Sequence, residues 1–350
     1  MNPLKILFFI LIISPIISSA YEVDNFSQRY NPLPDSNSVL SQAMNEQLKL
    51  AVETLNSQNK TKCVKSDIIN AVKKEIAPDT ATNFVGPIEK IAEKDSRIQR
   101  HTPLKNSIYS NKSFAEKIKK LIPTFYGEHS SINLNGQYIG TDKLGHFIYE
   151  GYSYYNVYKN DPTKSGLNQV LNNGLKSENN YYGKKSTGII SYGDLAANYE
   201  GLLFWKDIYN EKKSENSYFS CWNGQWKQTR NFNWSDYASS AWDEAINCSK
   251  YDEDTEIKKH VESKLKALTD SHKNRKIKNI VFACPMSVGE CMRLKTKYGK
   301  IKDSILGPDC INAYISSPHN DIHSAQKADE VLKVNSNGVE KLLNKNKSSN

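Results

Sequence analysis

The chain has 350 residues, of which 24% are charged, and a formal net charge of +9 at pH 7. This length is enough for one large domain or two small ones with a sizeable core. Lysines supply most of the positive charge and are mixed with acids along the chain, without the aromatic-interleaved basic stripe of a nucleic-acid-binding protein. We therefore expect no nucleic-acid partner, and at most a weak attraction to an anionic envelope surface.

Residues 1–20 have the three zones of a secretory signal peptide. Lys5 gives a positive start, Ile6–Ile17 is a mainly apolar run, and Ser18-Ser19-Ala20 supplies the small residues of a cleavage site. The apolar run is shorter than the roughly 20 residues that span a bilayer. We predict a cleaved signal and a secreted or periplasmic protein with no transmembrane span after signal removal; the alternative is an uncleaved membrane anchor.

Six cysteines follow the predicted cleavage site. An even number of cysteines in an exported chain favours disulfide bonds. The rival interpretation is a metal site, but the chain has no C-x-x-C pair, and the closest two cysteines are seven residues apart. Sequence leaves the disulfide pairing open among Cys63, Cys221, Cys248, Cys284, Cys291 and Cys310.

Helical patterns dominate the first part of the mature chain. Residues 21–34 have no hydrophobic period and contain two prolines, which predicts an extended lead-in. Asp35-Ser36 is a predicted N-cap for a helix whose apolar residues recur at three- and four-residue steps. The next three predicted helices cover about Val64–Ile76, a segment opened by Pro87, and Ser113–Ile122.

The middle of the chain alternates between helices and polar segments. Phe125–Gly140 is rich in Gly, Asn and Ser and is predicted to be a loop. Thr141 is a predicted N-cap of the helix that follows it, and Ser191 caps a second strong helix. Between them we expect a short helix at Ser165–Leu175 and a polar loop at Asn172–Ser186.

An Asn-Gly pair between aromatic runs predicts a β-hairpin near residues 218–229. Residues 314–350 are rich in Asn, Ser and Lys, and we expect a partly mobile tail. The predicted fold class is mainly α: a multi-helix domain over residues 35–313 with this small hairpin and a disulfide-braced C-terminal part. The remaining predicted elements are helices at Ser235–Ile246 and Thr255–Leu268, a strand at Ile277–Ala283, and a loop or short helix at Cys284–Cys291.

Two helix starts carry polar groups at helical spacing. Asp142, His146 and Glu150 are four residues apart and share one face of the first helix, and Asp194 and Asn198 share a face of the second. Small residues permit close approach of the two helices, so we expect the polar groups to meet. These small residues are Gly145, Ala197 and Gly201.

This polar cluster supports two chemical interpretations. A carboxylate beside a histidine fixes its tautomer and raises its basicity, so His146 oriented by Asp142 or Asp194 is a candidate general base. His146 with Asp142, Asp194 or Glu150 is a candidate metal site, although hydrolytic zinc sites usually have more than one nitrogen or sulfur ligand. The sequence identifies no cofactor.

A structural interpretation competes with both. Asp142 and Asp194 lie in the first turns of their helices, where a carboxylate interacts favourably with the helix dipole. A buried histidine network fixes how two helices pack and needs no substrate. We favour a structural or ligand-binding role for the cluster of Asp142, His146, Asp194 and Asn198.

The two motifs carry a resemblance. Asp142-Lys143-x-x-His146, followed downstream by Ser191, Asp194, Ala197, Asn198 and Gly201, is similar to the motif layout of VanZ-like and related small envelope proteins. The match covers residues 142–201, and such relatives carry these motifs on membrane helices or in small lipoproteins. The resemblance implies a shared polar helix pair. The whole chain also resembles a group of exported bacterial proteins from which no activity carries over.

Other candidate groups are weaker. Glu128-His129 is expected to be solvated, or else to reach the first motif from the loop. Trp222, Trp226, Trp234 and Trp242 are expected to be buried core, with sugar stacking as the alternative if they are exposed. Asp243 and Glu244 are adjacent residues on a predicted helix and should point apart, so they predict no glycosidase-like acid pair.

No G-x-S-x-G, Walker or dinucleotide-binding glycine pattern occurs in the chain. We therefore expect an exported envelope or secreted protein whose partner is an envelope component or a small ligand. The alternative is an envelope hydrolase that uses His146 as general base or metal ligand.

Overall fold

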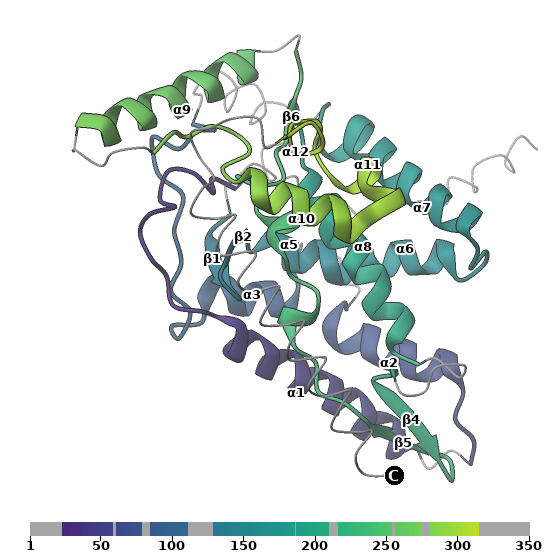
Figure 1. Ribbon diagram of the computed structural model, residues 1–350. Coiled ribbons are helices and arrows are strands. Elements are labelled where there is room, and N and C mark those ends of the chain that lie inside the picture. The colour runs from purple at the N-terminus through teal and green to yellow at the C-terminus, as the bar shows by residue number, and fades with distance from the viewer. Residues whose placement is uncertain are drawn as a thin grey trace, which may run out of the picture.

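The computed structural model confirms the predicted mainly α fold class. Helices dominate the described residues, and the strands among them form small two-stranded antiparallel sheets (Figure 1). The predicted signal peptide, the predicted helix at Ser113–Ile122 and the tail from residue 315 lie outside the described residues. The structure describes residues 23–58, 61–78, 85–110, 129–185, 187–209, 216–253, 256–274 and 280–314.

The first three predicted helices are confirmed. Leu48 and Val72 are among the fully buried apolar residues through which the first two helices join the core. Asp35 accepts a hydrogen bond from the backbone N–H of Asn37, while the Ser36 side chain makes no capping bond. These helices are α1 (Asn37–Asn56), α2 (Lys65–Ile76) and α3 (Pro87–Lys94).

A long helix at the centre of the molecule packs against α8 (Tyr192–Asp207). An added Cβ at Gly151 would lie 2.6 Å from the Cα of Gly201, so the two backbones touch at this crossing. The long helix has a π-helical turn in its middle, a feature frequent at functional sites. Its segments are α5 (Asp142–Gly145), the π turn η1 (His146–Glu150) and α6 (Gly151–Tyr158).

The predicted short helix after α6 is confirmed but longer than expected. Thr163 caps α7 by accepting a hydrogen bond from the N–H of Gly166, and α7 lies against α6. The predicted polar loop at Asn172–Ser186 is partly wrong, because α7 and a following π turn continue through this segment; the Asn179 side chain bonds the Leu175 carbonyl. The elements are α7 (Lys164–Ser177) and η2 (Glu178–Tyr182).

Two hairpins are built on Asn-Gly turns. The predicted hairpin is confirmed, with Asn223 and Gly224 both at positive φ. The predicted loop at Phe125–Gly140 is wrong over residues 131–140, where Asn135-Gly136 makes the same turn at positive φ. A two-residue turn of this kind needs positive φ at both positions. The hairpins are β1 (Ser131–Leu134) with β2 (Gln137–Gly140), and β4 (Phe219–Trp222) with β5 (Gln225–Gln228).

The predicted helix at Ser235–Ile246 is wrong. The segment contains only two short 3₁₀ turns, because polar side chains compete for its backbone groups. Asp243 accepts from the N–H of Ala245, and the Asn247 amide donates to three carbonyls of separate segments. The 3₁₀ turns are η4 (Trp234–Asp236) and η5 (Ser240–Trp242).

Disulfides brace the C-terminal part, as predicted. The bonds join Cys63 to Cys221, Cys248 to Cys284, and Cys291 to Cys310. Residues 280–283, the described part of the predicted strand at Ile277–Ala283, form no strand. The remaining elements are β3 (Ile189–Ile190), β6 (Lys250–Tyr251), α9 (Glu256–Asn274), α10 (Val288–Tyr298), η6 (Gly299–Ile301), α11 (Lys302–Ile305) and α12 (Pro308–Ile311).

Aromatic rings fill the core beneath the central helix. The ring of Phe147 lies 5.0 Å from that of Trp234 and 5.7 Å from that of Trp242, measured between centroids. Trp226, Trp234 and Trp242 are buried as predicted, but Trp222 is 77% exposed at the end of the β4–β5 hairpin, so the prediction of a buried set fails there.

Within the described ranges, every helix is too short or too polar to cross a bilayer.

Candidate functional site

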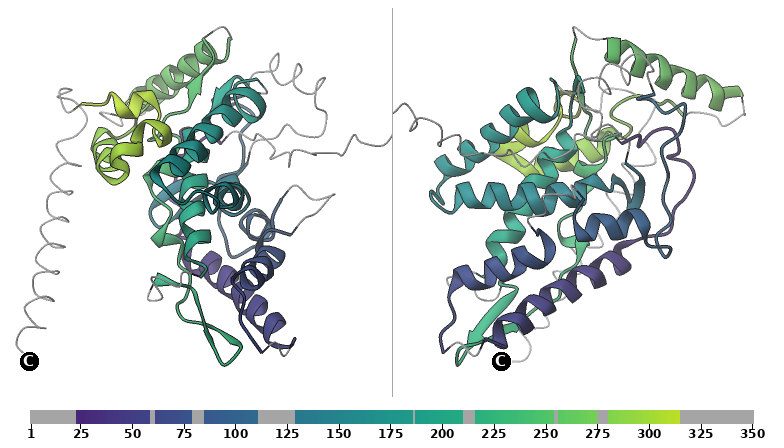
Figure 2. Two further views of the ribbon diagram at one scale, coloured as in Figure 1. Left: turned by 90° about the vertical axis from the view of Figure 1, so that its right-hand side faces the viewer. Right: turned by 180° about the vertical axis from the view of Figure 1, so that it is seen from behind.

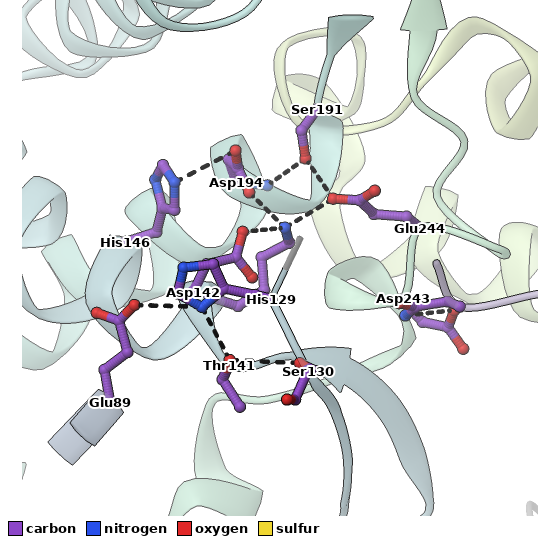
Figure 3. A network of polar contacts seen from close by, with 12 residues as sticks. Glu89, His129, Ser130, Thr141, Asp142, His146, Ser191, Asp194, Asp243 and Glu244 are labelled. Atoms are coloured by element: carbon purple, nitrogen blue, oxygen red, sulfur yellow. Dashed lines mark hydrogen bonds and ion pairs between the residues drawn. The ribbon is translucent and has the colours of Figure 1, made fainter. Parts of the chain in front are cut away.

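The structure brings the two predicted polar motifs together. His146, on η1, places Nε2 at 3.2 Å from Oδ2 of Asp194, which lies in the first turn of α8 (Figure 3). Its other ring nitrogen, Nδ1, lies 3.1 Å from the side-chain amide of Asn198, one turn further along α8. Asp142, His146 and Asp194 offer ligand atoms that lie within 4.8 Å of one another. All four residues of the predicted cluster are buried.

The surrounding hydrogen bonds assign the histidine tautomer. With its nitrogen facing the helices, the Asn198 amide lies 3.3 Å from the His146 carbonyl, 3.1 Å from the Asp194 carbonyl and 3.1 Å from Nδ1 of His146. In this orientation Nδ1 accepts a hydrogen bond, and Nε2–H donates to Asp194. Both ring nitrogens are therefore engaged by the protein, and His146 has no lone pair directed at a substrate.

Lys143 is the group that sequence reasoning missed. Its ammonium lies 2.9 Å from Asp142, 2.6 Å from Asp194 and 2.6 Å from Glu244, and its side chain is fully buried. Lysine is almost never fully buried unless it is paired. Lys143 is part of the first motif. The motif is explained by Asp142 at the start of a helix, so nothing in the pattern indicated that the lysine side chain points inward.

The charges of this group are set by burial and by one another. Burial opposes a charged ammonium, yet the three carboxylates raise the pKa of Lys143 well above its ordinary value. Burial also acts to raise the pKa of Asp194, but its neighbours His146 and Lys143 hold it below its ordinary value. Burial raises the pKa of Glu244 to about 7. Lys143 and Asp194 are therefore charged at neutral pH, while Glu244 is partly protonated.

Glu244 and Asp243 point to different partners. Ser191 caps α8 by accepting from the N–H of Asp194 at 3.2 Å, and its hydroxyl donates to Glu244 at 2.9 Å. Asp243 instead accepts from Arg29 at 2.8 Å. The two acids diverge as predicted, although the segment that carries them is not a helix.

A second polar centre lies on the other side of Asp142 (Figure 3). His129 was predicted to be solvated, but its side chain is only 8% exposed, and its Nδ1 lies 3.1 Å from Thr141 Oγ1, 3.4 Å from Glu93 and 3.6 Å from Glu89. Glu128 lies outside the described residues. The Thr141 hydroxyl donates to Glu93 and makes no capping bond, so its predicted N-cap bond is absent.

The acids of this second centre have opposite protonation states. Burial raises the pKa of Glu89 to about 8. Burial also acts upward on Glu93, but hydrogen bonds from His129, Thr141 and Ser130 lower its pKa to about 2. Burial acts to lower the pKa of His129, but the hydrogen bond to Glu93 and the charge of Asp142 outweigh this effect, so the pKa is raised. A neutral Glu89 thus lies beside an ionised Glu93.

A pocket opens beside His146. It has a volume of about 180 Å³ and lies between η1, α6, α7 and α8. Glu150 and Tyr154 line it from the same helix as His146, and Asn198 lines it from α8. Burial raises the pKa of Glu150, which favours its protonated form. The remaining lining residues are Ser153, Val157, Val170, Asn173, Gly174, Ser177 and Glu178.

The cluster is a poor match for a divalent metal ion. Two of the three candidate ligands, Asp142 and Asp194, already lie 2.9 and 2.6 Å from the ammonium of Lys143. A metal ion bound by them would lie close to a buried positive charge, which is electrostatically unfavourable. Glu150, the further predicted ligand, lines the pocket. Lys143 supplies the positive charge that a metal ion would otherwise bring.

Comparison with known proteins leaves the chain without an assigned relative. No protein-family model matches it, and neither the curated proteins nor the solved structures contain a significant match. The polar helix pair and the pocket beside it are therefore the features from which a function can be inferred.

Proposed function

We propose that this chain is an exported protein that binds a small polar ligand in the pocket beside His146. Three disulfides are consistent with an oxidising compartment outside the cytoplasm. The resemblance of residues 142–201 to VanZ-like envelope proteins supports a place in the cell envelope. The ion pairs of Lys143 then form the rigid support on which the pocket is built.

The observation that carries the proposal is the joint position of His146 and Asn198. Both residues belong to the buried network, and both line the pocket. Glu150 and Tyr154 add a carboxyl and a phenol to the same wall. Convergent polar groups in a concave pocket are the usual mark of a ligand site. The small volume fits a ligand of the size of an amino acid or a monosaccharide.

The experiment is saturation-transfer NMR with a mixture of D-glucosamine, D-glucose and glycine, which offer amine, hydroxyl and carboxylate groups. Ser153 is exposed at the pocket wall, so Ser153→Trp should obstruct the pocket without disturbing the core. The matched control is Ser66→Trp, at an exposed position on α2. We expect transfer in the wild type and in the control and its loss in Ser153→Trp. Equal transfer in all three chains, or none in any, contradicts the proposal.

A second candidate function is acid–base catalysis, and the raised pKa of Glu150 favours it. A carboxyl with a raised pKa keeps its proton to a higher pH than an ordinary carboxyl and can donate it to a bound group. Glu150, rather than the fully bonded His146, is then the acid of an envelope hydrolase. Glu150→Gln should abolish turnover of a bound ligand followed by NMR and leave its binding in place. Unchanged turnover in this variant would exclude the hydrolase.

A further inference from the structure

The β4–β5 hairpin holds one tryptophan inward and one outward. Trp226 is 5% exposed and packs edge-on against Tyr209 at 5.0 Å. Side chains alternate across a strand, and Trp222 is paired with Gln225, so it projects from the opposite face. Trp222 is 77% exposed, whereas every other tryptophan of the chain is buried.

The hairpin is fixed rigidly to the body of the molecule. Asn56, at the end of α1, exchanges two hydrogen bonds of 2.9 Å with the backbone of Trp226. The disulfide between Cys63 and Cys221 ties the residue next to Trp222 to the segment that opens α2. Figures 1 and 2 show this hairpin at one end of the molecule and α9 at the opposite end. Because the hairpin is held rigidly, Trp222 loses less conformational entropy when it binds a partner.

Other exposed residues share this end with Trp222. Val64 is 49% exposed and follows Cys63, which the disulfide holds beside Cys221 on the Trp226 side of the hairpin. Lys62 and Lys65 flank Val64, and both are exposed. Lys227 is exposed and pairs with Ser220, which places it on the face of Trp222 as its diagonal neighbour. We name Trp222, Val64, Lys62, Lys65 and Lys227 the tryptophan tip.

The charge of the tryptophan tip is positive. Among the described residues no ion pair joins Lys62, Lys65 or Lys227 to an acid. Asp67 is the acid in the first turn of α2, and it has a partner of its own. An exposed indole near three ammonium groups, none paired with an acid among the described residues, complements a surface that has negative charges outside and an apolar interior.

We propose that the tryptophan tip docks on the surface of an anionic phospholipid bilayer. Tryptophan is favoured at the membrane–water interface because its ring is apolar and its N–H is polar. Each lysine close to an anionic membrane strengthens binding by about fivefold. A neutral glycan would also stack on Trp222, but it would gain nothing from the three lysines. The tip contains none of the residues that line the pocket, so this inference is independent of the proposed function.

The first experiment is sedimentation with lipid vesicles. The purified chain lacks residues 1–20, which removes the predicted signal and keeps every described residue. We expect it to bind phosphatidylcholine vesicles that contain phosphatidylglycerol and not to bind vesicles of pure phosphatidylcholine. High salt should release it from the anionic vesicles. Trp222→Ala should lower the partition coefficient by about tenfold because the buried indole area is lost. The control Val281→Ala removes an exposed apolar side chain elsewhere and should bind normally.

Charge variants test the lysines separately. Replacement of Lys62, Lys65 and Lys227 by glutamine should abolish binding to the anionic vesicles. The control replaces three exposed lysines outside the tip, which gives the same net charge, and should keep most of the binding. The control positions are Lys258, Lys266 and Lys300.

Fluorescence identifies the residue that enters the membrane. Because the other tryptophans are buried, brominated phospholipids should quench only the Trp222 emission, and Trp222→Phe should show no quenching. The proposal is overturned if Trp222→Ala binds anionic vesicles as well as the wild type. It is equally overturned if Trp222 mediates adsorption to insoluble glycan, such as chitin, while vesicles do not bind.

Discussion

The ammonium of Lys143 lies 2.6 Å from the carboxylate of Asp194, and this contact joins the starts of the two helices that carry the polar motifs. Asp142 and Glu244 complete the shell around the same ammonium. Removal of one member of a buried ion pair leaves an uncompensated charge, which typically costs about 3–5 kcal/mol. The group is therefore the most sensitive point of the central helix pair.

We predict that Lys143→Met lowers the free energy of unfolding by about 3–5 kcal/mol, because Asp142 and Asp194 lose their common cation. Urea denaturation followed by circular dichroism measures the change. Lys74→Met, at an exposed position on α2, is the matched control and should change stability by less than about 0.5 kcal/mol. If the two variants unfold at the same urea concentration, the ammonium has no supporting role.

Sequence patterns predicted the helices of this fold because their apolar residues recur at helical spacing. They also predicted that His146, Asp194 and Asn198 would meet, since the spacing and the small residues place them on facing surfaces. The same patterns failed at Ser235–Ile246. There, the backbone follows the hydrogen bonds of Asp243 and Asn247, and both side chains also bond partners distant in the sequence.

The burial of Lys143 and His129 depends on tertiary contacts that no local pattern contains. The partner of Lys143 that lies furthest along the chain, Glu244, is 101 residues away, and Glu93 precedes His129 by 36 residues. The β1–β2 hairpin was different, because Asn135-Gly136 is the signal that correctly predicted the β4–β5 turn. Here the sequence contains the turn signal, although the Gly-, Asn- and Ser-rich composition of Phe125–Gly140 favours a loop.

Stability should fall as pH rises from about 5 to about 8. The pKa of Glu244 is about 7 in the folded chain, and that of Glu89 is about 8, both above the ordinary value of 4.5. Over this window the unfolded chain has already released these protons and the folded chain still holds them, so higher pH favours unfolding. The raised pKa of His129 acts in the same direction. Urea midpoints measured from pH 5 to pH 8 test this slope.

Glu244→Gln isolates one contribution to the slope. Glutamine keeps an oxygen that accepts from Lys143 and Ser191 but cannot lose a proton at neutral pH. We expect a flatter dependence of stability on pH between about 5 and 7, with the difference on the order of 2 kcal/mol. Glu253→Gln, at an exposed position, should leave the slope unchanged. A Glu244→Gln slope equal to that of the wild type would show that this carboxyl titrates normally.

Gly201 should not tolerate alanine. Alanine in place of glycine within a helix ordinarily stabilises by about 1 kcal/mol. At Gly201, however, an added Cβ would meet the carbonyl of Phe147 and lie 2.8 Å from the Cα of Gly151. The two helices would have to move apart, so Gly201→Ala should destabilise the chain by about 1–3 kcal/mol instead of stabilising it. Thermal unfolding tests this prediction. We expect a lower midpoint for Gly201→Ala, and a higher midpoint would mean that the helices do not touch here.

His146 and Asp194 should be energetically coupled. His146→Ala removes the imidazole that contacts Oδ2 of Asp194 and the side-chain amide of Asn198, which should cost about 1–3 kcal/mol. In a double-mutant cycle with Asp194→Asn, the two losses should not add, and the interaction energy should be about 1–3 kcal/mol. An imidazole that served only catalysis would give nearly additive changes and an almost unchanged melting temperature in His146→Ala. A coupling near zero would therefore separate His146 from the support of the pocket, and the ligand site would have to be sought around Glu150 alone.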